Sequence, residues 1–348
     1  MQLKGRIKVK RASIFVGAVA AVGFSVAANA QDKPVELKFS HGVPATHPIV
    51  KSSEEWAQSI TKASNGTIKI TIYPAQQLGK AFDHYDMARD GIADVTYANP
   101  GYAPGRFPVI AAGELPFVLT NAKEGSAALD EWYRKYAAKE MHEVRFCLAF
   151  VHDPGTFHTT KKKVVLPSDV AGLKVRPAGG TIARLVTMLG GTNVQASAAE
   201  ARDVLEKGVA DALTFPWGSM FLFNIDKVTK FHIDTPLYTS VQTWVMNKAT
   251  YEKMSAAQKK VIDDHCSNEW ALKIATPWAD FEHGGIEKMK ASGGHEVYQL
   301  TPEQIDAWRK ATEPLINEWS EGVRKAGLDP KAVMDALRAA AKNRNSSY

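Results

Sequence analysis

Residues 89–101, RDGIADVTYANPG, and residues 206–218, EKGVADALTFPWG, share a core of glycine, a β-branched residue, alanine and aspartate. In each copy a helical stretch is expected to stop at the glycine, Gly91 or Gly208, because glycine readily takes the left-handed conformation of a helix exit. A short strand follows in each copy, and Pro100 or Pro216 interrupts it. The repeat therefore predicts two halves of similar design.

Each half is expected to alternate strands and helices around its copy of the repeat. The first half predicts strands at residues 37–40, 67–73 and 94–97 and helices at 49–63 and 82–90. The second half predicts strands within 172–180 and at 193–195 and 211–215 and helices at 181–189 and 198–207, the last opened by a capping box of Ser197 and Glu200. This alternation predicts two α/β sheets with helices on their faces.

The chain beyond the second half is predicted to be mostly helical. Residues 231–247, FHIDTPLYTSVQTWVMN, predict a strand passing between the lobes, and Ser255 with Gln258 opens a long helix. Thr301 and Gln304, with Pro302 in the first turn, open another helix. No low-complexity linker interrupts the sequence, so we expect two lobes that are joined by ordered crossovers and move about a hinge.

The first thirty residues are typical of a signal peptide. Five basic residues and no acid precede an apolar run at residues 14–26, and Ala28, Asn29 and Ala30 form a small-x-small cleavage site. The run is too short to span a membrane. The cleavage site has no cysteine, so a lipid anchor is not expected. We expect cleavage after Ala30 and a periplasmic protein that is not embedded in the membrane.

The charge and length of the mature chain limit its expected partners and its number of lobes. Without the five basic residues of the signal peptide, 38 of the 43 lysines and arginines remain against 37 acids, so nucleic acid is not an expected partner. The remaining 318 residues suggest two lobes. We expect one lobe at residues 31–152 plus about 243–282, and the other at 153–242 plus about 283–340.

The chain has two cysteines, Cys147 and Cys266. An oxidising compartment permits a disulfide between them, but the spacing carries no information on their geometry. We expect two separately buried thiols.

Sequence signatures of enzymes are mostly absent. The chain has no G-x-S-x-G, H-E-x-x-H or phosphate-binding loop motif, so we expect neither catalysis nor a cofactor. His152, Asp153 and His158 are the best candidates for metal ligands, but we expect hydrogen-bonded loop residues and no metal. His41 and His47 flank the loop after the first strand. We expect His41, and also His158, to face a ligand, with the role of a loop hydrogen-bond donor as the alternative.

Arg176, in GLKVRPAGG at residues 172–180, is the main candidate for a ligand-binding residue. It stands at the carboxyl end of a predicted strand, where ligands bind in open α/β sheets. Its planar guanidinium can donate two parallel hydrogen bonds to a carboxylate, and the helix predicted to begin at Thr181 would turn free N–H groups toward the same anion. The alternative is a structural ion pair with an acid of its own lobe.

Several aromatic residues accompany this arginine. Tyr102 follows the first repeat, Phe215 and Trp217 belong to the second, and Phe157 lies upstream of the arginine's strand. Pro216 and Gly218 predict irregular backbone around Trp217, which favours a binding role over a core role. We expect these four aromatic residues, together with Asn99 of the first repeat, to line the cleft; core packing is the alternative for each aromatic residue.

Five stretches together resemble the solute receptors of tripartite ATP-independent periplasmic (TRAP) transporters of the dicarboxylate-receptor type (DctP family). They are LKFSHGVPATHP, ASNGTIKITIYPAQQLG, GIADVTYANPG with ELPFV, LPSDVAGLKVRPAGG with LVTMLGGTNV, and LEKGVADALTFP. The resemblance implies a periplasmic-binding-protein fold whose two lobes close over a small organic acid, and a long helix crossing both lobes at residues 255–282. It also implies that Arg176 clamps the ligand carboxylate and that membrane permease subunits receive the ligand.

The chain departs from other members of this family at three positions. Phe157 and Tyr102 replace polar anchors of the sialic-acid receptors, and Phe215 replaces an amide that often touches the carboxylate. We therefore expect a monomeric receptor for an aromatic or apolar monocarboxylate. The alternatives are a C4-dicarboxylate or keto-acid receptor of the same family and a secreted enzyme that uses His158 or Asp153.

Overall fold

A computed structural model describes residues 1–3, 5, 8 and 32–348, and residues 32–348 form one compact unit. The signal peptide expected at residues 1–30 lies outside the described residues, apart from residues 1–3, 5 and 8. Among the described residues, no helix is long and apolar enough to cross a membrane.

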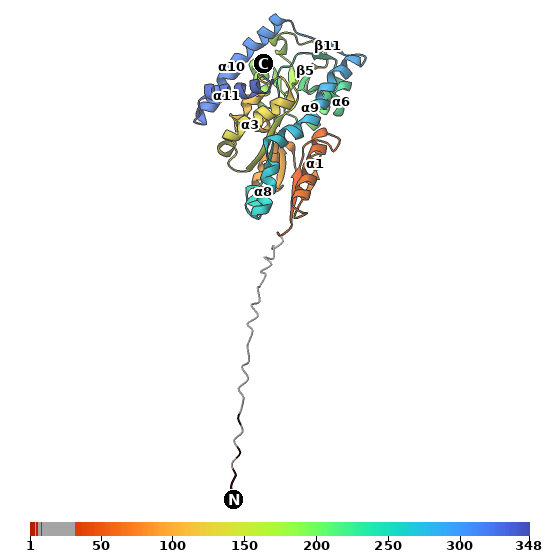
Figure 1. The fold of residues 1–348 in the computed structure, drawn as a ribbon. Coiled ribbons are helices and arrows are strands. Elements are labelled where there is room, and N and C mark those ends of the chain that lie inside the picture. The colour runs from red at the N-terminus through yellow and green to blue at the C-terminus, as the bar shows by residue number, and fades with distance from the viewer. Residues whose placement is uncertain (4, 6–7, 9–31) are drawn as a thin grey trace. The chain divides into compact units, whose positions relative to one another are not determined.

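Two separate sheets organise this unit (Figure 1). The first sheet has the strand order β2 (Ile68–Tyr73), β1 (Val35–Ser40), β3 (Val95–Ala98), β10 (Val241–Met246) and β4 (Arg145–Val151). The second has the order β11 (Glu296–Tyr298), β9 (Phe231–Ile233), β5 (Thr156–Thr159), β8 (Ala212–Phe215), β6 (Lys174–Arg176) and β7 (Thr192–Asn193). In the first sheet β1 is parallel to β2 and β3, whereas β10 is antiparallel to both of its neighbours.

Helices cover these sheets as the alternating pattern predicted. The helices are α1 (Pro48–Ala63), α2 (His84–Asp90), α3 (Ala122–Glu140), α4 (Gly180–Met188), α5 (Ala201–Glu206), α6 (Trp217–Leu222), α7 (Lys248–Glu252), α8 (Ala256–His265), α9 (Asn268–Ala291), α10 (Pro302–Lys325) and α11 (Pro330–Asn343). The repeat has the expected helix exits, since Gly91 and Gly208 have φ values of 75° and 68°. The capping boxes predicted at Ser197, Ser255 and Thr301 are also present.

Two predicted elements are each divided in the structure. Residues 231–247 form two strands, β9 in the second sheet and β10 in the first, so the connection between the sheets is an irregular segment. The long helix expected at residues 255–282 is two helices, α8 and α9, because the chain breaks at Cys266 and the Ser267 hydroxyl caps α9.

Helix α9 contacts elements that belong to both sheets. It contacts α1, α3 and β4 on the side of the first sheet and α6 and β11 on the side of the second, as Figure 1 shows. The C-terminal helix α11 packs against α3. The residue bounds that we expect for the two lobes stay a prediction.

The expectation of two separate thiols is wrong. Cys147 on β4 and Cys266 at the end of α8 form a disulfide, with Cα atoms 4.5 Å apart. The packing of α8 and α9 over the first sheet brings the two residues together across 119 positions of sequence. Sequence spacing does not encode that packing, so the pairing was not predictable from the sequence.

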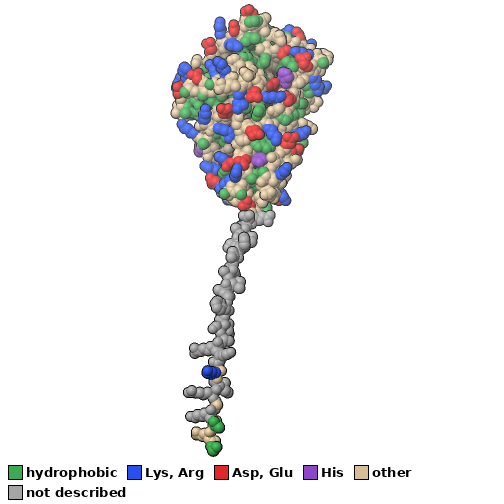
Figure 2. Space-filling view, viewed as in Figure 1, with side chains coloured by type: hydrophobic (Ala, Val, Ile, Leu, Met, Phe, Trp, Pro, Cys, Tyr) green, Lys and Arg blue, Asp and Glu red, His purple; other side chains and the backbone are tan. Residues whose placement is uncertain are grey.

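Charges of both signs share the surface. Figure 2 shows lysine, arginine, aspartate and glutamate side chains interspersed over the visible face of residues 32–348. This face has no large area of a single sign.

Candidate functional site

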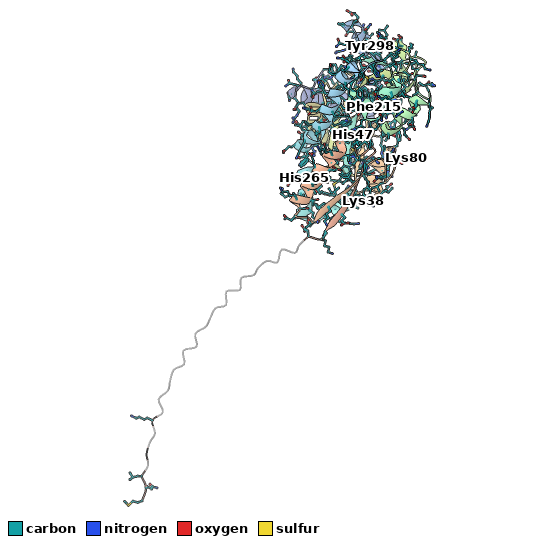
Figure 3. The ribbon with its side chains drawn as sticks, turned by 90° about the vertical axis from the view of Figure 1, so that its right-hand side faces the viewer. Lys38, His47, Lys80, Phe215, His265 and Tyr298 are labelled. Carbon is teal, nitrogen blue, oxygen red and sulfur yellow. A yellow bond between two sulfur atoms is a disulfide. The ribbon has the colours of Figure 1, made fainter. Side chains whose placement is uncertain are left out.

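A cavity lies between the two sheets. Residues at or near the ends of β1, β3, β6 and β8 line it, together with residues of β10 and α9. Its volume is about 60 Å³. Figure 3 places two of its lining residues, His47 and Phe215, between Lys38 on β1 of the first sheet and Tyr298 on β11 of the second. Both halves of the chain therefore contribute to this site.

Arg176 is the last residue of β6 and is only 1% exposed. Its Nε donates to the Ala196 carbonyl at 2.9 Å, and its Nη2 donates to the Tyr102 hydroxyl at 3.4 Å. Among the described residues, no carboxylate forms an ion pair with it. The predicted alternative of a structural ion pair is therefore not found, and the hydrogen bonds of this buried cation go only to neutral oxygens. Such a group favours binding of an anion.

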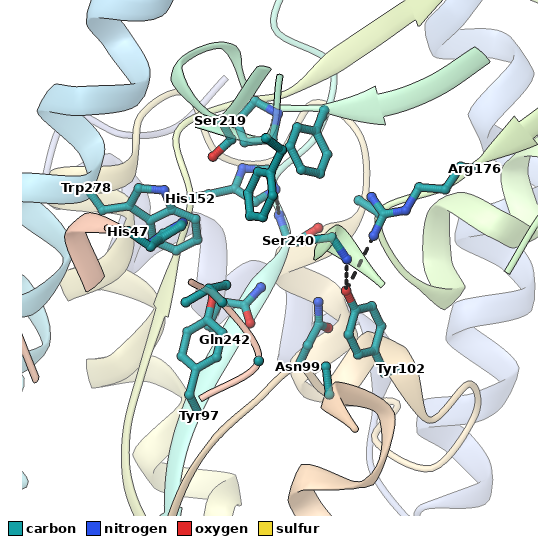
Figure 4. Close-up of a pocket in the computed structure, with 18 residues that line it drawn as sticks. His47, Tyr97, Asn99, Tyr102, His152, Arg176, Ser219, Ser240, Gln242 and Trp278 are labelled. Atoms are coloured by element: carbon teal, nitrogen blue, oxygen red, sulfur yellow. Dashed lines mark hydrogen bonds between the residues drawn. The ribbon is translucent and has the colours of Figure 1, made fainter. Parts of the chain in front are cut away.

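Tyr102 and Asn99 lie beside this guanidinium on the loop after β3 (Figure 4). The Tyr102 hydroxyl accepts from the Ala198 amide at 3.3 Å and from Arg176, so its own proton is free for a ligand. The Asn99 Oδ1 accepts from the Gly101 amide at 2.8 Å, while its Nδ2 donates to no described residue. Three side chains thus present N–H or O–H donors suited to one carboxylate.

The predicted use of the α4 N-terminus for ligand binding is not supported by the geometry. The Thr181 hydroxyl donates to the Glu114 carboxylate at 2.8 Å, so an acid of this chain already lies at that helix start. Glu114 is buried, and burial raises its pKa to about 7.

An apolar wall completes the cavity. It consists of Val43, Phe215, Pro216, Phe223 and Trp278. The Phe215 ring lies 5.4 Å from the Arg176 guanidinium carbon and 5.7 Å from the Phe223 ring. A flat apolar group would pack against this wall while its charged end met Arg176.

Two buried histidines also line the cavity in the neutral form. His47 caps α1, and its Nδ1 accepts from the Ile49 amide at 3.2 Å, which places the ring proton on Nε2. Burial lowers the pKa of His47 to about 3. His152 hydrogen bonds through both nitrogens, to the Asp153 carbonyl and the Ser240 amide, and burial lowers its pKa to about 4.

Four of the eight predicted site residues line the cavity, namely Arg176, Phe215, Tyr102 and Asn99. Trp217, Phe157, His158 and His41 do not. The prediction of irregular backbone at Trp217 is wrong, because Trp217 begins α6. It packs in a core cluster with Leu213 and Met220. Phe157 packs against Trp308, with ring centroids 5.4 Å apart. Core packing, the stated alternative, therefore describes both residues.

The two predicted histidines are held away from the cavity by buried contacts. His158 Nε2 bonds to the Phe215 carbonyl at 3.0 Å, and its Nδ1 bonds to His232 at 2.9 Å. His41 lies between the Phe39 and Tyr97 rings, with centroids 4.2 Å and 5.4 Å away. His152, Asp153 and His158 do not converge, and among the described residues no group of three or more metal-ligating side chains forms.

Other lining residues were not among the predicted site residues, including His47, Tyr97, Gln242 and Trp278. Two carried a usable signal. His47 precedes Pro48 at a helix start, which is a capping position, and Gln242 is a polar residue in the apolar strand VQTWVM. Trp278 lies within a long helix, where its pattern does not differ from that of a core residue.

The family model for bacterial extracellular solute-binding protein, family 7 (DctP) matches residues 39–322. The chain belongs to this family. Family 7 proteins include periplasmic solute receptors of TRAP transporters, so the predicted resemblance and the receptor role are confirmed.

Three solved TRAP solute-binding proteins share the fold of this family 7 chain. One from Rhodoferax ferrireducens, in complex with copurified benzoate, is 27% identical with a TM-score of 0.83, over 89% of this chain and 98% of that one. One from a marine metagenome, with co-crystallized 3-hydroxybenzoate, is 31% identical with a TM-score of 0.83, over 90% and 99%. One from Bordetella bronchiseptica, with bound (R)- and (S)-mandelate, is 28% identical with a TM-score of 0.84, over 89% and 99%. The predicted two-lobed α/β fold is confirmed.

Proposed function

We propose that this protein captures an aromatic monocarboxylate in the periplasm and delivers it, chemically unchanged, to the membrane permease of a TRAP transporter. The observation that carries the proposal is the buried Arg176 guanidinium, which forms no ion pair with an acid of the described chain and borders a wall of aromatic rings. We further propose that the chain acts as a monomer, after removal of its signal peptide at Ala30.

The lining residues favour one negative charge and an apolar body. Arg176 is the only lysine, arginine, aspartate or glutamate among the described residues that line the cavity. A dicarboxylate would bring a second anion into contact with neutral groups, and burial of an unpaired charge is costly. The benzoate, 3-hydroxybenzoate and mandelate found in the similar proteins each combine one carboxylate with one ring, and they support the same class of ligand here.

Micromolar affinity requires both the Arg176 guanidinium and the apolar wall of the cavity. A charge-assisted hydrogen-bonded pair contributes about 1.5–3 kcal/mol, whereas micromolar affinity needs about 8 kcal/mol. Burial of roughly 200 Å² of ring surface, at about 25 cal/mol per Å², adds about 5 kcal/mol. The lobes must therefore close around the ring and exclude water, and that closed form would be the one presented to the permease.

The proposal is tested by thermal shift and calorimetry on refolded, ligand-free protein. We expect benzoate, 3-hydroxybenzoate or mandelate to raise the melting temperature, with about 2.7 kcal/mol of added stability at a hundredfold excess over Kd. Succinate and glucuronate should have no comparable effect. Each bound acid should be recovered unchanged by mass spectrometry after denaturation. A response to succinate without a response to any aryl acid would overturn the ligand class, and turnover of a bound acid would support an enzyme.

A further inference from the structure

Gln242 has an amide group that the protein itself does not satisfy. It lies on β10, the strand between β3 and β4, and its side chain lines the cavity with only 4% of the residue exposed. Its Oε1 is buried without a hydrogen-bond partner among the described residues. Buried amides are normally hydrogen-bonded, so this group indicates a partner that arrives from outside the chain.

The surroundings of Gln242 provide further polar groups without charge. His47 and Tyr97 line the same cavity, and the ring proton of the neutral His47 is on Nε2. In Figure 4, Arg176 and Tyr102 lie on one side of the cavity, and His47, Tyr97 and Trp278 lie on the other. Gln242 projects into the space between these two sides. The cavity thus has a cationic end and a second, neutral polar end.

We propose that Gln242 is a specificity-determining residue that hydrogen bonds a hydroxyl group on the ligand, so the preferred ligand is a hydroxy-substituted aryl monocarboxylate. This inference rests on the proposed function and narrows its ligand class. A hydroxyl both donates and accepts, so it satisfies the glutamine amide in either orientation of its oxygen and nitrogen. The neutral His47 ring offers a second donor to the same oxygen.

Other substituents fit this end of the cavity less well. A second carboxylate would meet no cation there, and a hydrogen or methyl group would leave the Gln242 amide unsatisfied when the lobes close. Sites built to bond a ligand hydroxyl discriminate strongly against the analogue that lacks it, because the protein's own polar group is then buried without a partner. Gln242 should therefore act mainly by rejecting unsubstituted acids.

The experiment measures Kd by calorimetry for matched pairs of acids on wild-type protein and on Gln242→Leu. The pairs are benzoate with 3- and 4-hydroxybenzoate, and phenylacetate with 3-hydroxyphenylacetate. We expect at least one hydroxylated acid to bind wild type tenfold or more tightly than its parent. Gln242→Leu should lose at least tenfold for that acid and gain or keep affinity for the parent. Gln242→Met, which keeps the length of the side chain, serves as the second variant if the leucine protein does not fold.

Three results separate the possible failures. Equal affinities of wild type for hydroxylated and parent acids would overturn the role of Gln242, since a bound water would then satisfy the amide. An equal loss for both acids in Gln242→Leu would overturn it as well, because a structural role predicts no discrimination. If wild type binds none of these acids, the proposed function fails, and the inference that rests on it fails too.

Discussion

Arg176 shows what a single residue must provide in this receptor. Most arginines of the described chain pair with a carboxylate at the surface, as Arg106 does with Asp86 and Glu143. Arg176 instead is buried and bonds only to the Ala196 carbonyl and the Tyr102 hydroxyl. Its charge is therefore held ready for a ligand by neutral groups.

Substitution Arg176→Lys should weaken binding of an aryl acid by a hundredfold or more, because an ammonium group cannot donate the two parallel hydrogen bonds of a guanidinium. The melting temperature of the ligand-free protein should change little. Calorimetry and thermal melts measure the two effects separately. Arg338→Lys, at an exposed position without an ion pair, is the control and should change neither. Collapse of the unliganded fold in Arg176→Lys would indicate a structural role instead.

Two buried carboxyls should give the protein a measurable pH dependence. Burial raises the pKa of Glu114 and of Glu282 to about 7. Glu282 accepts hydrogen bonds from the Ser219 amide and hydroxyl and the Trp278 indole, yet burial outweighs these bonds. Because the folded state holds the proton more tightly, the stability from each group is fully present below pH 4.5 and is lost as pH rises through about 7.

Wild type should lose free energy of unfolding between pH 5 and pH 8 as these carboxyls ionise. We expect Glu114→Gln and Glu282→Gln each to reduce that loss by up to about 3 kcal/mol. Urea unfolding at both pH values measures this difference. The comparison with wild type is needed because the buried histidines, whose pKa values are lowered, act in the opposite sense below pH 6.5. Glu269→Gln, at an exposed position on α9, is the control. A pH dependence unchanged from wild type would contradict the protonation of these carboxyls.

Residue type and strand position were enough to predict Arg176, Tyr102, Phe215 and Asn99 at the cavity. They were not enough for Gln242 and Trp278, which come from β10 and α9. These elements follow the second sheet in sequence but return to the first sheet or cross between the two. Local sequence carries no signal for such a return, so the part of the cavity that these two elements line depends on tertiary packing.

At the scale of elements, the alternation of strands and helices was predictable because each element buries one face and has a marked start. Pro48, Ser197, Ser255 and Thr301 stand at four of these starts. Breaks without a glycine or proline were not predictable, as at Cys266 between α8 and α9.

The contact between α6 and α9 depends on two glycines. A Cβ added at Gly285 would lie 2.3 Å from the Gly218 amide nitrogen, and one added at Gly218 would lie 2.4 Å from the Phe281 carbonyl oxygen. The two backbones therefore approach closely at the point where α9 meets the helix that carries Ser219 of the cavity.

Gly285→Ala should destabilise the protein by about 2 kcal/mol or more, since backbone must move to make room for the methyl group. Gly284→Ala is the matched control, because a Cβ there meets no atom within 4 Å. It should stabilise the helix by up to about 1 kcal/mol. Chemical denaturation of both variants checks the pair, and equal effects of the two substitutions would show that the helices do not pack this closely.

At the scale of the whole molecule, the disulfide links β4 to the junction of α8 and α9 across 119 residues. In a chain-entropy model, closing a loop of about this length stabilises the fold by roughly 5 kcal/mol. The double variant Cys147→Ser with Cys266→Ser should lose a large part of this amount in urea unfolding. Reductant should lower the stability of wild type under the same conditions and leave the variant unchanged. Insensitivity of wild type to reductant throughout unfolding and refolding would show that the bridge is absent.

The position of β10 between β3 and β4 has a consequence for the order in which the exported chain folds. Residues 145–151 precede residues 241–246 by a long stretch of chain, and all strands of the second sheet except β11 lie in between. The first sheet therefore remains open between β3 and β4 until this late segment inserts. Cys147 waits still longer for its partner. A newly exported chain of this receptor would expose two unpaired strand edges during that interval, and a chaperone that shields such edges should matter more for its yield than for that of a protein whose sheets close in sequence order.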